Sequence, residues 1–120
     1  MMRALLIVAM LGLSHFASAQ GGYITVDQFL RECRVDREPC MAFVMGVIEG
    51  ARHQTREQLK AQPYAFLVHG KPVCLPVTWG SETLTEVVLD VLDDQPQSHQ
   101  YSAVSGILYA LAGESNCYST

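Results

Sequence analysis

The chain has 120 residues, 49% of them hydrophobic, and a net charge of −4. This length allows one domain with one modest core. Binding to nucleic acid requires clustered Lys and Arg, whereas here twelve acidic residues outnumber eight basic ones, so we expect no nucleic-acid partner.

Residues 1–19 have the features of a cleavable secretory signal peptide. Arg3 precedes an apolar run from Ala4 to Leu13, and Ala17-Ser-Ala19 matches an A-x-A cleavage site. A run of about ten residues is too short to cross ~30 Å of hydrocarbon. We therefore expect a mature, single-domain chain of residues 20–120, located in the periplasm and without a membrane anchor.

The first half of the mature chain predicts two helices. Thr25 and Gln28 form a capping-box pattern at the start of the first. Pro39 suits the first position of a second helix that extends into residues 54–59. Apolar spacing predicts these buried faces: Val26, Phe29, Leu30 and Cys33 in the first helix, and Cys40, Phe43, Val44, Val47, Ile48 and Ala51 in the second.

Gly46 and Gly50 form a G-x-x-x-G pattern within the second predicted helix. Each glycine costs a helix about 1 kcal/mol relative to alanine, so a packing reason is expected. We interpret the pair as a groove in which another helix packs closely.

Residues 61–79 carry prolines and glycines without a sustained helical period. We predict a long, partly anchored loop with a short extended piece. His69, Gly70 and Lys71 are expected at a solvated turn tip, which could also enter the cleft of an enzyme. Trp79, the sole tryptophan, is either an interface anchor or a lid packed over the third helix.

The last third of the chain predicts two more helices. One runs from about Ser81 to about Asp93, and the acidic residues at its end are interpreted as a solvated helix terminus. Ser98 is expected to cap the other, which ends near Gly113. Their predicted buried faces are Leu84, Val87, Val88, Val91 and Leu92, and then Tyr101, Val104, Ile107, Leu108 and Leu111. The predicted fold class is a small all-α domain of four helices, stapled by disulfides.

The four cysteines all lie downstream of the leader, which indicates two disulfides and an oxidising compartment. Three connectivities are open. The last two helices are joined by a tight turn and should be antiparallel, which favours a bond between Cys74 and Cys117. Cys33 and Cys40 would then pair across the break that contains Pro39.

The order of these motifs resembles a known family. Cys33, the segment from Cys40 to Gly50, Cys74-Leu-Pro76, the Val-rich helix and the final Ala110-Leu111 with Cys117 are similar to Rap/Tai-type immunity proteins of bacterial type VI secretion. Phe43 departs from the family, which commonly has Tyr before the glycine motif, and residues 61–73 match it poorly.

The resemblance implies a small, helical, non-catalytic periplasmic protein that is often a homodimer. Such a protein binds a secreted peptidoglycan amidase and blocks its active-site cleft. From the residues themselves we expect no cofactor and no metal, and the candidate partner-binding residues are His69, Lys71 and Trp79.

Other functions find less support in the residues. A cysteine hydrolase would pair Cys40 with His53 or His69, but a disulfide consumes the thiol. The scattered His residues do not supply the paired ligands of a zinc site. The alternatives that remain are a periplasmic acid-stress chaperone and a family relative that has lost its toxin.

Overall fold

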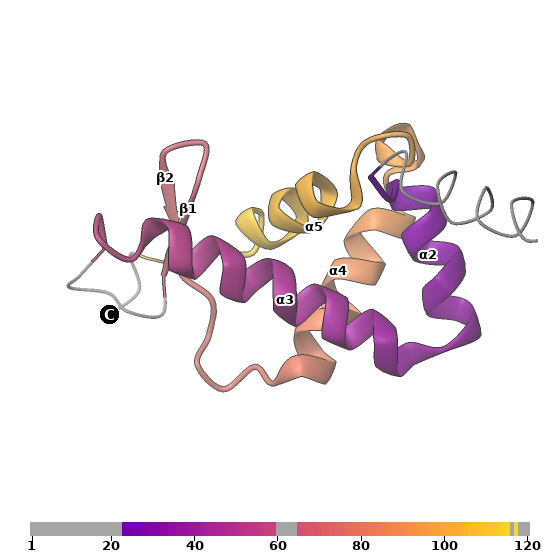
Figure 1. Cartoon of the computed structure of the whole chain (residues 1–120), viewed down its shortest axis with the longest axis horizontal. Helices are drawn as coiled ribbons and strands as arrows, with labels where there is room; N and C mark the ends of the chain where they lie inside the picture. The colour runs from indigo at the N-terminus through magenta and orange to yellow at the C-terminus, as the bar shows by residue number, and fades with distance from the viewer. Residues whose placement is uncertain (1–22, 60–64, 116, 118–120) are drawn as a thin grey trace, which may run out of the picture.

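The computed structural model describes residues 23–59, 65–115 and 117. The predicted leader at residues 1–19 lies outside this part. Figure 1 shows helices surrounding a common core, with a hairpin at one end. The elements are α2 (Val26–Val35), α3 (Arg37–Thr55), β1 (Phe66–Val68), β2 (Lys71–Val73), α4 (Ser81–Asp93), the 3-10 turn η1 (Pro96–Ser98) and α5 (Ala103–Ala112).

The expectation of a purely helical domain is wrong in one segment. The strands β1 and β2 form a two-stranded antiparallel sheet in which Phe66 lies opposite Val73 and Val68 lies opposite Lys71. The two residues between the strands, His69 and Gly70, have positive φ angles of 50° and 76°. Two consecutive left-handed residues match the twist of a tight hairpin, so the chain forms paired strands here in place of the expected loop.

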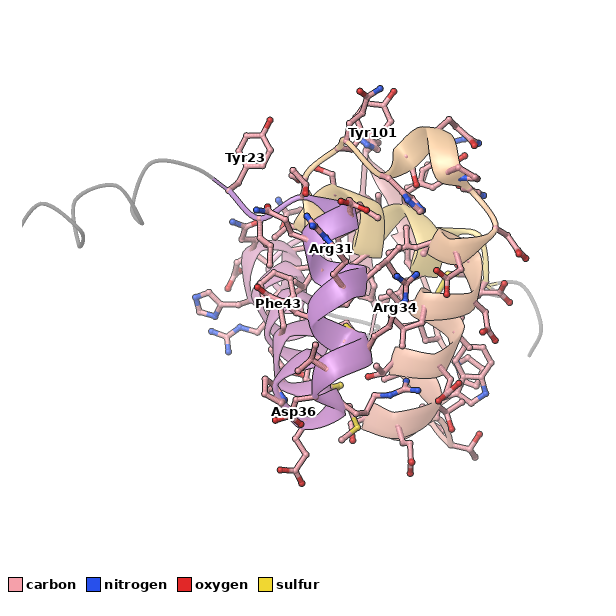
Figure 2. The ribbon with its side chains drawn as sticks, turned by 90° about the vertical axis from the view of Figure 1, so that its right-hand side faces the viewer. Tyr23, Arg31, Arg34, Asp36, Phe43 and Tyr101 are labelled. Atoms are coloured by element: carbon pink, nitrogen blue, oxygen red, sulfur yellow. A yellow bond between two sulfur atoms is a disulfide. The ribbon has the colours of Figure 1, made fainter. Side chains whose placement is uncertain are left out.

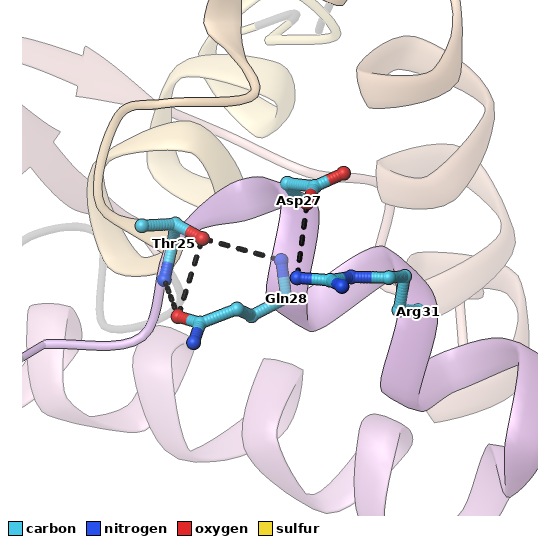
Figure 3. Close-up of polar contacts among 4 residues, drawn as sticks. All are labelled: Thr25, Asp27, Gln28 and Arg31. Carbon is cyan, nitrogen blue, oxygen red and sulfur yellow. Dashed lines mark hydrogen bonds and ion pairs between the residues drawn. The ribbon is translucent and has the colours of Figure 1, made fainter.

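The capping box predicted at the start of α2 is confirmed (Figure 3). The Thr25 hydroxyl accepts a bond from the Gln28 backbone N–H at 3.2 Å, and the Gln28 side-chain oxygen accepts one from the Thr25 backbone N–H at 2.9 Å. On the next turn, Arg31 pairs with Asp27 at 3.1 Å. The two bonds of the capping box satisfy backbone N–H groups at the helix start that have no partner within the helix, and the Arg31–Asp27 pair is a separate contact between side chains.

Helix α3 begins two residues before Pro39, the residue that was expected to open it. Asp36 ends α2 in an extended conformation and accepts a bond from the Glu38 N–H at 3.2 Å, so it serves as the N-cap of α3. Pro39 is then in the first turn, where its missing N–H leaves no bond unmade. The chain therefore turns sharply at a single residue between the two helices.

The core lies where all four described helices and the hairpin meet, and two expected core positions of α3 lie only at its border. Val44 and Ile48 of α3 are fully buried, whereas Phe43 and Val47 are half-buried, as Val87 and Val91 are in α4. The largest fully buried side chains are Phe29, Phe66, Ile48, Leu92, Ile107, Leu111, Val26, Val44, Val73, Val88 and Thr85.

Helix α5 starts later than predicted, and its buried face is correspondingly different. Ser98 belongs to the turn η1, and Ser102 is the N-cap, whose hydroxyl accepts a bond from the Ser105 N–H at 3.1 Å. Tyr101 and Val104, which were expected in the core, are 59% and 45% exposed. The buried residues of α5 are Ala103, Gly106, Ile107, Ala110 and Leu111, and of these Gly106 lies closely against Val26 of α2.

None of the helices among the described residues is long and apolar enough to cross a membrane.

Candidate functional site

Two disulfides hold the ends of the described elements together. Cys33 at the end of α2 is bonded to Cys40 at the start of α3, with Cα atoms 5.2 Å apart, and both residues are buried. Cys74 is bonded to Cys117 with Cα atoms 4.9 Å apart, and both are half-buried. This is the pairing that the helix geometry favoured, and it leaves no free thiol for nucleophilic chemistry.

The second disulfide lies at the base of the hairpin. Cys74 follows β2 directly, and its backbone N–H donates a bond to the Ser115 hydroxyl at 3.0 Å. The same hydroxyl is 3.4 Å from the Pro72 carbonyl, to which it donates. A covalent bond and two hydrogen bonds therefore fix the base of the hairpin to the chain segment that follows α5.

The hairpin has a buried end and an exposed end. Phe66 and Val73 are 0% and 2% exposed and belong to the core. At the other end, His69, Gly70 and Lys71 are exposed, and the hairpin projects beyond the neighbouring ribbon in Figure 1. Two of the three predicted partner-binding residues, His69 and Lys71, thus meet at a projecting tip, which we call the hairpin tip (residues 69–71).

Trp79, the third predicted partner-binding residue, does not belong to the hairpin tip. The chain leaves β2 and runs away from the tip to the start of α4 (Figure 1). Trp79 lies in this connection, where its backbone N–H donates to the Pro76 carbonyl at 3.1 Å, and its half-buried side chain packs against the core. Its position supports the interpretation of Trp79 as a structural lid.

The expectation that a helix packs on Gly46 and Gly50 is wrong within this chain. Both glycines are exposed, and a Cβ atom built on either would meet no atom of the described residues within 4 Å. They lie on an open groove between α3 and α5, whose apolar sides include Val47 and Leu108. The close helix contact occurs instead at Gly106, where a Cβ would lie 2.6 Å from a Val26 methyl group.

Two ion pairs connect the first helices to α4, and sequence reasoning did not foresee them. Arg34 of α2 lies 3.4 Å from Asp93, and Arg37 of α3 lies 2.8 Å from Glu86. Asp93 had been interpreted as part of a solvated helix end. All four side chains are 43–67% exposed, so each pair contributes little to stability.

The described residues contain no group of three or more His, Cys, Asp or Glu side chains that could hold a metal ion. Sequence reasoning did not foresee two exposed aromatic side chains, Tyr101 and Tyr109, which are 59% and 62% exposed. The cap at Ser102 sets the register of α5, and correct placement of that cap would have shown Tyr101 outside the helix.

Comparison with known proteins gives one match. The family model of the Rap1a immunity proteins matches residues 25–117, which include every described helix and strand. No curated protein and no solved structure matches the chain. Since the family model covers well over half of the sequence, the chain belongs to the Rap1a immunity protein family.

Proposed function

We propose that the chain is a periplasmic immunity protein that binds a peptidoglycan amidase delivered by type VI secretion and occludes its active site. The observation that carries this proposal is the family match over residues 25–117, because an immunity protein acts by binding its cognate toxin. Two disulfides in a small domain are typical of exported proteins, which supports a periplasmic location.

The hairpin tip is the part of the described surface best suited to enter an active-site cleft. It is narrow, it projects, and its base is fixed by the Cys74–Cys117 bond. A loop that is already ordered loses little conformational entropy when it binds. The Lys71 ammonium and the His69 imidazole can donate hydrogen bonds to carboxylates or carbonyls of the toxin.

The tip alone is too small to account for tight inhibition. A stable complex buries about 800 Å² on each partner, over roughly 20–30 residues. Helix surfaces beside the hairpin must therefore contact the toxin as well. Inhibition in this mechanism is steric, since the bound protein excludes the peptidoglycan substrate from the cleft.

The first test is protection of living cells. A sensitive bacterium expresses one amidase effector of the source organism with an export signal, together with this chain either intact or lacking residues 1–19. We expect survival only with the intact chain, because toxin and immunity protein must meet in the periplasm. Survival with the truncated chain would contradict the location, and lysis in both cases would contradict the function.

The second test separates an amidase from other toxin classes. Purified chain is mixed with the amidase, with a muramidase effector and with a nuclease effector, and the products of each reaction are measured by chromatography. We expect inhibition of the amidase alone. Inhibition of the nuclease or the muramidase alone would keep the immunity role and overturn the amidase assignment.

The third test places the inhibitory element. His69→Ala and Lys71→Ala remove the exposed side chains of the tip, and Arg31→Ala removes an exposed cation from α2 as a matched control. We expect a higher inhibitor concentration for half-inhibition in the two tip variants and no change in the control. Equal inhibition by all three variants would move the inhibitory element away from the hairpin.

A further inference from the structure

We propose that a cleft between the hairpin tip and the α4–α5 corner is a socket that receives an uncharged side chain of the toxin. This inference rests on the proposed function, and it adds a second anchor beside the tip. The socket has a volume of about 350 Å³. Its lining includes His69, Gln95, Gln97, Tyr101, Ser105 and Tyr109.

The chemistry of the lining selects the occupant. None of the residues that line the socket is Asp, Glu, Lys or Arg, so a charged group of the toxin would find no carboxylate, ammonium or guanidinium partner there. The two tyrosine rings offer apolar area, and hydroxyl and amide groups around them offer hydrogen bonds. A large uncharged side chain, aromatic or aliphatic, fits this combination.

The socket also has the composition of an interface centre. The buried centres of protein interfaces are poor in charge and rich in tyrosine, and tyrosines are frequent hot spots. Tyr101 and Tyr109 are 59% and 62% exposed, and Figure 2 shows Tyr101 projecting from the surface. Tyr101, Ser105 and Tyr109 follow one another at intervals of four residues, which places them along one side of α5 and its N-terminal entry.

One wall of the socket is held in place by backbone bonds. The Tyr101 carbonyl accepts a bond from the Val26 N–H at 2.9 Å, and the Tyr101 N–H donates to the Ser98 carbonyl at 3.0 Å. The Ser98 hydroxyl in turn donates to the Gln95 carbonyl at 2.7 Å. Because the main chain of this wall is held before binding, it does not have to be ordered when a side chain enters the socket.

The socket adjoins the hairpin tip, so a toxin bound to the tip would also contact the socket. His69 belongs both to the tip and to the lining. A toxin that receives the tip in its active-site cleft therefore brings the rim of that cleft against the socket. An uncharged residue on the rim would fill it.

The test measures dissociation constants by calorimetry, with the purified amidase that the intact chain neutralises as the probe. The socket variants are Tyr101→Ala and Tyr109→Ala, and Tyr23→Ala is the matched control because Tyr23 is 73% exposed and does not line the socket. Truncation of a hot-spot tyrosine to alanine should raise the dissociation constant about 30-fold. We expect this loss in both socket variants, a smaller one in the Tyr→Phe versions, and wild-type affinity in the control.

A variant that adds a negative charge to the socket tests whether the occupant must be uncharged, and it is chosen so that the fold is preserved. Ser105 is the third residue of α5, and Ser102 is the N-cap, so Ser105→Glu completes a capping box and should preserve the helix. The same substitution puts a carboxylate at the socket. We expect unchanged or higher thermal stability together with a loss of affinity of at least tenfold.

Each remaining outcome overturns the proposal. Wild-type affinity in Tyr101→Ala, Tyr109→Ala and Ser105→Glu would exclude the socket while leaving the immunity function intact. Failure of the unmodified chain to bind any amidase effector of the source organism would refute the proposed function, and the assigned occupant with it. Sedimentation showing a dimer that Tyr101→Ala dissociates would identify the occupant as a second copy of the chain.

Discussion

A single methyl group should have opposite effects on stability at different glycines of this protein. In Gly106→Ala, the added Cβ would lie 2.6 Å from Val26 Cγ2 and 3.4 Å from Leu92 Cδ2. Carbon atoms prefer separations of about 3.5–4.0 Å, so the first of these contacts is a strong overlap. Both neighbours are 0% exposed, and a stiff β-branched valine at the start of α2 cannot move aside without disturbing the core.

The expected magnitude follows from two opposing terms. Overpacking a well-packed core costs about 1–3 kcal/mol, and an overlap of this depth belongs near the upper end of that range. Replacing glycine by alanine within a helix recovers about 1 kcal/mol. The net loss should be about 1–2 kcal/mol, which lowers the midpoint of thermal unfolding by roughly 5–15 °C in a domain of this size.

The matched control is Gly50→Ala in α3. A Cβ at Gly50 would meet no atom of the described residues within 4 Å, so no steric overlap opposes the stability that alanine adds to the helix. We expect this variant to be more stable than the wild type by about 1 kcal/mol. Circular dichroism at 222 nm during urea and thermal unfolding measures both variants.

A double variant identifies the overlapping atoms. Val26→Ala removes the methyl group that Gly106→Ala would meet. The double variant should therefore lose less stability than the two single variants added together, by an interaction energy of about 0.5–3 kcal/mol. Additive losses, or a Gly106→Ala protein at least as stable as the wild type, would refute the packing argument.

Further substitutions test the cap, the disulfide, the turn and a surface ion pair. Thr25→Ala should lower the free energy of unfolding in urea by about 1 kcal/mol, because the Gln28 N–H loses its acceptor. Thr25→Ser keeps a hydroxyl and should lose much less stability; equal losses in the two variants would show that the hydroxyl does not cap the helix. Removal of the Cys74–Cys117 disulfide by Cys74→Ser with Cys117→Ser should lower the free energy of unfolding by about 4 kcal/mol. Removal of the Cys33–Cys40 disulfide, which closes a shorter loop, should lower it by about 2.5 kcal/mol, and a larger loss from the shorter loop would contradict the chain-entropy argument. Gly70→Ala should cost about 1–2 kcal/mol, since Gly70 has a φ of 76°, and no loss would show that the turn can adopt another conformation. Arg34→Ala should change stability by less than about 1 kcal/mol, and a larger effect would mean that its exposed pair with α4 matters more than its exposure indicates.

Features that depend on neighbouring residues in the chain could be read from the sequence. The capping box at Thr25 requires a hydroxyl and an amide three residues apart, and both its bonds are present. The buried stripe of α2 follows from the helical repeat and was predicted residue by residue. The family resemblance was equally visible, because it depends on the order and spacing of cysteines and glycines along the chain.

Features that depend on which surfaces meet were predicted less well. Tyr101 has the spacing of a core residue, yet it lies outside α5 because Ser102 caps the helix and the turn η1 takes up the residues before it. Gly46 and Gly50 have the pattern of a helix contact, but α5 makes its close approach at Gly106 against α2. Sequence periodicity shows that a face is apolar or small, and it does not show what will be packed against it.

The candidate site divides in the same way. The sequence by itself determined that residues 69–71 form an exposed turn, that four cysteines can close two loops, and that the chain resembles immunity proteins. Only the tertiary structure decided that Trp79 covers the core while His69 stands at a tip beside Tyr101 and Tyr109. The reason is physical: turns and caps are formed by bonds between near neighbours, whereas a binding surface is formed by side chains from distant segments that only the packed core brings together.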